Sequence, residues 1–171
     1  FSINKTDDDN KNGRKTHFFS NSNFELNQSL FDESSIELKI EKVSNDNYTS
    51  LYSLESTSPI IKDTNVLENI IEFSGYKDDF YIDFSLESYE TMNKLSSDRY
   101  EFVYPNYSLS KTSYFDKGLF NNFEFTSSGN NKKYSTNISE TVQVNDFLFN
   151  GKNKISKLGI NHNFKTILKN V

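Results

Sequence analysis

The stretch FYIDFSLE, residues 80–87, decides the fold class of this chain. Its residues alternate one by one between an apolar set, Phe80, Ile82, Phe84 and Leu86, and a polar set, Tyr81, Asp83, Ser85 and Glu87. Successive side chains of a β-strand point to opposite faces, so a period of two sorts these sets cleanly, whereas a helical period of 3.6 would mix them. The stretch therefore predicts a strand with one apolar and one polar face.

A second stretch, SIELKIE at residues 35–41, repeats this pattern. Its apolar set is Ile36, Leu38 and Ile40, and its polar set is Glu37, Lys39 and Glu41. Weaker alternation occurs around Phe24 and Leu26 and over residues 67–73, 100–112, 119–125, 142–149 and 164–168.

Clusters of turn-forming residues separate these segments, at residues 44–47, 75–79, 127–133 and 150–153. The chain is therefore predicted to be an all-β domain of about eight strands in antiparallel hairpins. Within residues 142–149 the alternation slips between Val144 and Phe147, which predicts a β-bulge there.

The composition agrees with a thin sheet. Hydrophobic residues make up 34% of the 171 residues and the mean hydropathy is −0.72, so apolar side chains suffice for about one face of each strand. The chain has no alanine, the strongest helix former, and no cysteine, which excludes disulfides and cysteine-based zinc sites. A net charge of −5 argues against nucleic acid as a partner. Because no phosphate-binding loop or nucleophile elbow is visible, we expect a protein that is not an enzyme and has no cofactor.

Two architectures share this alternation. A soluble antiparallel sheet buries its apolar face in a core, whereas an outer-membrane barrel turns that face to lipid and its polar face to the lumen. Long strands and tyrosines near strand ends favour the barrel, although aromatic residues are also ordinary strand formers. In a barrel, the lipid-facing candidates are Ile36, Leu38, Ile40, Phe80, Ile82, Phe84 and Leu86, and the lumen-facing candidates are Glu37, Lys39, Glu41, Asp83 and Glu87.

The stretch SSDRYEFVYPNYSLSK, residues 96–111, reads as a strand built of tyrosine and polar residues around a proline. Pro105 lacks the N–H for a ladder hydrogen bond, so we expect an interrupted register at a bulge or strand end; an edge strand of a soluble sheet is the alternative. Asp98 and Arg99 fit a mutual ion pair or a turn lock, and a contact from Arg99 to a substrate phosphate is another interpretation.

Residues 98–107, with the strand at 80–92 before them and residues 134–149 after them, resemble the barrel region of the lipopolysaccharide (LPS) assembly outer-membrane protein family, LptD, also called the organic-solvent-tolerance family. The family-like positions in this motif are Asp98, Arg99, Tyr100 and Pro105. Residues 27–33, 37–46, 58–61 and 65–69 are similar to the family in the same order, so the resemblance covers about residues 21–170.

The resemblance implies that residues 1–171 are a partial domain of a large outer-membrane β-barrel, truncated at both ends, which inserts LPS into the outer leaflet of a Gram-negative bacterium. The implied partners are LPS, an LptE-like plug lipoprotein, outer-membrane lipid, and periplasmic LPS-bridge proteins that bind through a missing N-terminal region. The chain departs from well-known members because it has no cysteine and no periplasmic jellyroll. The alternative function is a soluble extracellular or periplasmic β-rich binding or adhesion module.

Overall fold

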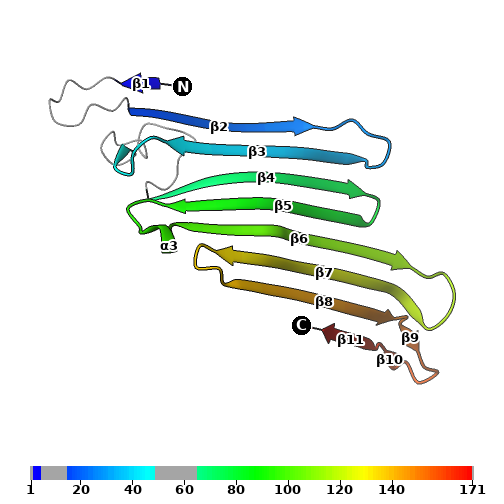
Figure 1. The fold of residues 1–171 in the computed structure, drawn as a ribbon. Coiled ribbons are helices and arrows are strands. Elements are labelled where there is room, and N and C mark those ends of the chain that lie inside the picture. Colours follow the sequence, from blue (N-terminus) through cyan, green and yellow to red (C-terminus); the bar gives the residue numbers. More distant parts are fainter. Residues whose placement is uncertain (1, 5–14, 49–64, 171) are drawn as a thin grey trace.

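The computed structural model describes residues 2–4, 15–48 and 65–170. Its elements are β1 Ser2–Asn4, β2 Lys15–Glu25, β3 Glu33–Val43, β4 Val66–Lys77, β5 Phe80–Thr91, α3 Ser96–Arg99, β6 Tyr100–Tyr114, β7 Phe120–Tyr134, β8 Ser139–Gly151, β9 Lys154–Ile155, β10 Asn161–His162 and β11 Lys165–Asn170. Strands β1 to β8 and β11 form one sheet, and β9 and β10 form a separate two-stranded ribbon (Figure 1).

The main sheet is an up-and-down meander. Its strand order follows the chain order, and each strand pairs antiparallel with its neighbours. The sheet is open, with β1 at one edge and β11 at the other (Figure 1). The all-β, antiparallel up-and-down fold predicted from the alternation is therefore confirmed.

The deciding stretch is the first part of β5, which follows β4 through a turn at Asp78 and Asp79. Asp78 has a φ of 49°, which a short hairpin turn uses and which aspartate tolerates better than most residues. Like residues face one another across the hairpin, because Phe84 lies opposite Phe73. The alternation of β5 thus continues onto β4.

The predicted turn at residues 127–133 is wrong, because these residues lie inside β7. The hairpin turns instead after Tyr134, where Asn137 has a φ of 64°. Gly129 has a packing role rather than a turning role: a Cβ atom added there would lie 2.9 Å from the Tyr107 ring of the neighbouring strand. The small residues of this stretch therefore leave room for an aromatic ring, as strand glycines often do.

Pro105 marks a bulge, as its missing N–H predicts. Val103 pairs with Glu87 and Asn106 with Ser85, so two residues of β6 stand opposite one residue of β5. The register of β6 with β7 shifts at the same place. The edge-strand alternative is wrong because β6 lies between β5 and β7. The strand itself begins at Tyr100, since residues 96–99 form the single turn α3.

The predicted bulge between Val144 and Phe147 is wrong as well. The pairing of β7 with β8 runs without a break from Asn122 to Lys133, and its only shift lies between Phe120 and Asn122. Val144 therefore sits opposite Ser128, on the face away from Phe147. The phase slip in the sequence reflects valines on the polar face rather than a change in backbone register.

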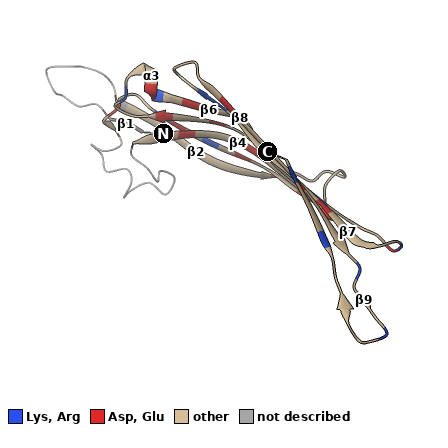
Figure 2. Cartoon of the chain, turned by 90° about the horizontal axis from the view of Figure 1, so that it is seen from below, with Lys and Arg blue, Asp and Glu red and all other residues tan. Residues whose placement is uncertain are grey.

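We call the side of the sheet that carries Ile36, Phe73 and Phe84 the apolar face, and the side that carries Glu37, Glu72 and Ser85 the polar face. The main sheet is a single twisted layer (Figure 2). Phe84 is 39% exposed and Leu86 41%, whereas Ser85 between them is 3% exposed. The middle of the apolar face is therefore exposed at Phe84 and Leu86, whereas Ser85 on the polar face is buried.

The strands are staggered across the sheet, like steps (Figure 1). The line of paired residues that starts at Phe24 passes through Ile36, Phe73, Phe84, Tyr107 and Gly129 to Gln143. Phe24 is one residue from the end of β2, whereas Gln143 is eight residues from the end of β8 on the same side of the sheet. Seven residues over six strand-to-strand steps amount to a stagger of about 1.2 residues per strand, or a strand tilt of roughly 40° in a closed barrel.

Candidate functional site

The polar face brings together the acidic candidates from the sequence. Glu37 lies opposite Glu72, and Glu72 lies opposite Ser85, so Asp83 and Glu87 are on the same face two residues to either side. Lys39 reaches the same face, because it pairs with Ile70, which lies opposite Glu87. The candidates of two separate stretches thus form one surface across β3, β4 and β5.

Neutral hydroxyl and amide groups donate hydrogen bonds to two carboxylates of this surface, Asp83 and Glu87. Glu87 accepts hydrogen bonds from Ser85 Oγ at 2.5 Å, Tyr89 Oη at 2.6 Å and Asn106 Nδ2 at 2.9 Å. Asp83 accepts one from Tyr81 Oη at 2.8 Å. These bonds hold the carboxylates in place without cancelling their charge, so the surface stays negative.

Sequence reasoning missed Glu72, which lies between the acidic residues of β3 and β5. The apolar–polar alternation that would assign Glu72 to the polar face is broken in β4, because Ile70 and Ile71 are adjacent. The register explains this break, since Ile71 pairs with Leu86 on the apolar face and Ile70 with Glu87 on the polar face.

Glu41 has a different environment from the other acidic candidates. The ladder between β3 and β4 ends at the pair of Lys39 and Ile70, although β3 continues to Val43. Beyond it, Glu68 N donates to Glu41 Oε2 at 2.8 Å, and Glu41 N donates to Asn69 Oδ1 at 3.1 Å. Lys39 Nζ lies 3.2 Å from Glu41 Oε1. Glu41 is only 2% exposed, so its side chain bridges the gap between two diverging strands.

The seven apolar candidates lie together on the other face. Ile36 pairs with Phe73, and Leu38 with Ile71, which continues to Leu86. Phe84 continues the row to Tyr107, and Ile82 pairs with Leu109. Farther along, Phe123 pairs with Phe149 and Phe125 with Phe147. The apolar residues therefore form a band that crosses the strands and moves with their stagger.

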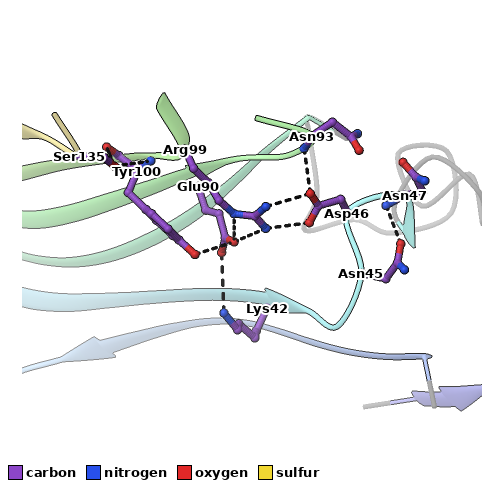
Figure 3. Close-up of polar contacts among 9 residues, drawn as sticks. All are labelled: Lys42, Asn45, Asp46, Asn47, Glu90, Asn93, Arg99, Tyr100 and Ser135. Carbon is purple, nitrogen blue, oxygen red and sulfur yellow. Dashed lines mark hydrogen bonds and ion pairs between the residues drawn. The ribbon is translucent and has the colours of Figure 1, made fainter. Parts of the chain in front are cut away.

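Arg99 organises a cluster at one end of the apolar face, which we call the rim cluster: Lys42, Asp46, Glu90 and Arg99 (Figure 3). Arg99 Nη1 and Nη2 donate to the two oxygens of Asp46 at 2.8 and 2.7 Å, and Nε donates to Glu90 Oε1 at 2.8 Å. Lys42 Nζ is 3.7 Å from Glu90 Oε2. Arg99 thus ties the connection after β3 to β5, which is a turn lock, and its partners are Asp46 and Glu90 rather than Asp98.

Four further hydrogen bonds extend this lock. Asn93 N donates to Asp46 Oδ2 at 3.2 Å, and Tyr100 Oη donates to Glu90 Oε1 at 3.1 Å. Tyr100 N donates to Ser135 Oγ at 3.0 Å, and Ser135 Oγ donates in turn to the Tyr100 carbonyl at 3.0 Å. Three connections at this end of the sheet are therefore joined by polar contacts.

The electrostatics of the rim cluster follow from this geometry. The hydrogen bonds from Arg99 lower the pKa of the Asp46 carboxyl from its ordinary value of 3.8. The same bond to Asp46, together with that to Glu90, raises the pKa of Arg99. Because a bidentate pair with a carboxylate uses the planar fork of the guanidinium, Lys in place of Arg99 would lose part of this lock.

Other kinds of site find little support. No group of histidine and acidic side chains that could hold a metal ion occurs in residues 2–4, 15–48 and 65–170. No helix in this part of the chain is long and apolar enough to span a membrane. The family-like segment at residues 58–61 lies outside the described residues.

No known protein-family model, curated protein or solved structure matches this chain. The resemblance to the LPS-assembly family, and the transport function that it implies, therefore stay predictions.

Proposed function

We propose that this chain is a wall segment of an outer-membrane β-barrel that inserts LPS into the outer leaflet. The observation that carries the barrel is the exposed apolar band on one face of a single-layered sheet whose other face holds hydrogen-bonded carboxylates. In water such a band would have to be covered, whereas in a bilayer the lipid covers it.

The stagger of the strands supports the same proposal independently. A tilt of roughly 40° lies within the range of known membrane barrels. The apolar band moves in the direction of the stagger, because it is centred near Leu38 on β3 and near Phe147 and Phe149 on β8. A band that shifts in this way becomes level once tilted strands stand in a membrane.

The transport of LPS rests on the sequence resemblance. In this function the polar face lines the lumen, where Glu37, Asp83 and Glu87 form a hydrophilic wall against the sugars of LPS or against a plug lipoprotein. The apolar residues, among them Phe84, contact outer-membrane lipid. Periplasmic bridge proteins that deliver LPS are the further partners in this proposal.

Depletion of the full-length protein in its native host tests this function. We expect LPS to accumulate in the periplasm and the cells to become permeable to large hydrophobic toxins. Photo-crosslinking residues at positions 37, 83 and 87 should capture LPS or the plug lipoprotein, while the same residue at position 84 should capture phospholipid. Normal surface LPS after complete depletion would exclude LPS transport.

The soluble binding module is the competing proposal. It requires a partner layer over the band that contains Ile71, Phe84 and Leu86, each of which is at least 39% exposed. Limited burial of apolar side chains in the described residues, where Tyr48, Leu67, Met92 and Val103 are the buried hydrophobic ones, gives such a module little core. We therefore favour the membrane barrel.

A further inference from the structure

A recess on the apolar face lies where β6 and β7 reach the end of the sheet that carries the rim cluster. It has a volume of about 320 Å³, and its lining includes Phe102, Tyr104, Lys133 and Asn137. Phe102 and Tyr104 pack edge to face, with ring centroids 6.2 Å apart, and form an aromatic wall. The recess thus joins aromatic surface to a single cation near the strand end.

Lys133 is exposed and makes no ion pair with any described residue. Its neighbours across the strands are neutral, because it pairs with Phe102 on β6 and with Ser139 on β8. The next residue of β7 on the same face is Asn131, which is neutral too. This cation therefore stands among aromatic, hydroxyl and amide groups.

The carboxylates Glu101, Glu140 and Glu90 near the β7–β8 hairpin contact groups other than Lys133. Glu101 holds Lys132 on the polar face at 3.2 Å, and Glu140 accepts a hydrogen bond from Tyr134 at 3.4 Å. Glu90 belongs to Arg99, two strands from Lys133. A positive charge without a counter-ion, at the edge of an apolar band, fits an anionic group from outside the described sheet.

We propose that Lys133 and Asn137, with the rings of Phe102 and Tyr104, bind the phosphate headgroup of an anionic membrane lipid. The proposal rests on the membrane barrel proposed above. A phosphate accepts hydrogen bonds from the Lys133 ammonium and from the side-chain amide of Asn137. The backbone N–H of Asn137 donates to the Tyr134 carbonyl, whereas its side chain makes no hydrogen bond with the described residues. Aromatic rings lie favourably at the headgroup level, where the acyl chains continue along the apolar band. An anionic lipid fits this recess because its phosphate complements the Lys133 cation and its acyl chains can continue along the apolar band.

The test uses the full-length polypeptide in lipid nanodiscs that contain phosphatidylglycerol and phosphatidylcholine in equal amounts. Native mass spectrometry after detergent extraction counts the retained lipids of each kind. We expect enrichment of phosphatidylglycerol for the unchanged protein and a loss of about fivefold in that enrichment for Lys133→Gln, since one basic residue near an anionic surface contributes on this scale. Lys133→Arg should keep the enrichment.

Lys132→Gln is the matched control, because it removes the same charge one residue away on the polar face, where Lys132 pairs with Glu101. We expect this variant to retain the unchanged enrichment. Equal enrichment in the unchanged protein and in Lys133→Gln, or an equal loss in Lys132→Gln, would overturn the lipid site. Displacement of the retained lipid by millimolar inorganic phosphate would show a free-phosphate site and would also overturn it.

The outcomes separate this inference from the proposed function. If the protein enters nanodiscs but retains both lipids equally, the lipid site fails and the barrel stands. If the protein does not enter nanodiscs at all, both fail.

Discussion

Replacement of Phe84 by arginine tests whether the apolar face lies in lipid. Phe84 is central in the apolar part of β5, opposite Phe73 and Tyr107, and is 39% exposed. In a membrane the guanidinium would enter hydrocarbon near the bilayer centre, which costs about 2–4 kcal/mol of barrel stability. In a soluble sheet whose apolar face is covered by a partner layer, Phe84→Arg would also bury a cation and be destabilising, so the quencher experiment below separates lipid from a protein core.

The matched control is Asp83→Arg, which places the same side chain one residue away on the polar face. It removes the hydrogen bond from Tyr81 and should cost about 1 kcal/mol. Reversible urea unfolding of the full-length protein in lipid vesicles, followed by circular dichroism, measures both variants. If Phe84→Arg is no more destabilising than Asp83→Arg, the apolar face does not lie in lipid.

The absence of cysteine makes a second readout clean, because each introduced cysteine is the only one in this chain. A polarity-sensitive fluorophore at position 84 should be quenched by lipid-confined quenchers, and one at position 83 by aqueous quenchers. The same alternation should extend to positions 80, 82 and 86. Lipid quenchers that reach none of these even-numbered positions would refute the membrane assignment.

Further predictions concern packing, pH and the sheet edges. Gly129→Ala should destabilise the fold by about 1–3 kcal/mol in urea unfolding, because the new Cβ would lie 2.6 Å from the Val142 carbonyl oxygen; a stability within error of the unchanged protein would contradict this packing. The lowered pKa of Asp46 means that its pair with Arg99 stabilises the fold above pH 3.8 and that this contribution is lost as the pH falls through the lowered value. Proteolysis near residue 46 should therefore increase below about pH 3.8 in the unchanged protein and in the control Asp98→Asn, but Asp46→Asn should be cleaved readily at neutral pH as well. This 171-residue segment expressed alone should aggregate without detergent because its sheet edges are open, and a soluble, cooperatively melting monomer would contradict the barrel.

The sequence predicted the strands and their faces well where apolar and polar residues alternate one by one. The alternation at residues 36–41 and 80–87 placed every apolar candidate on one side and every polar candidate on the other. It failed where the polar face carries apolar side chains, as at Val144 and Ile70, because hydropathy alone does not report which side of the sheet a residue occupies.

The rim cluster was less predictable for a different reason. Arg99 stood out in the sequence, but its partner Asp46 is 53 residues away in the chain and only the pairing of β3, β4 and β5 brings them together. The sequence neighbour Asp98 offered a local alternative that the structure does not use. Lys133 also escaped notice, because an unpaired cation becomes visible only when its neighbours on both adjacent strands are known.

The extra residue at Pro105 shifts the alternation of side chains along β6 by one position. Before it, the even-numbered residues Tyr100, Phe102 and Tyr104 share a face, and after it the odd-numbered residues Tyr107 and Leu109 continue the same face. Deleting this one residue would remove the bulge and leave one continuous alternation, because Asn106 would then follow Tyr104 opposite Ser85 and Tyr107 would stay opposite Phe84. Homologous chains that lack the extra residue should therefore keep the same order of aromatic and polar residues on both sides of the deletion, so that loss of a single codon there needs no compensating substitution.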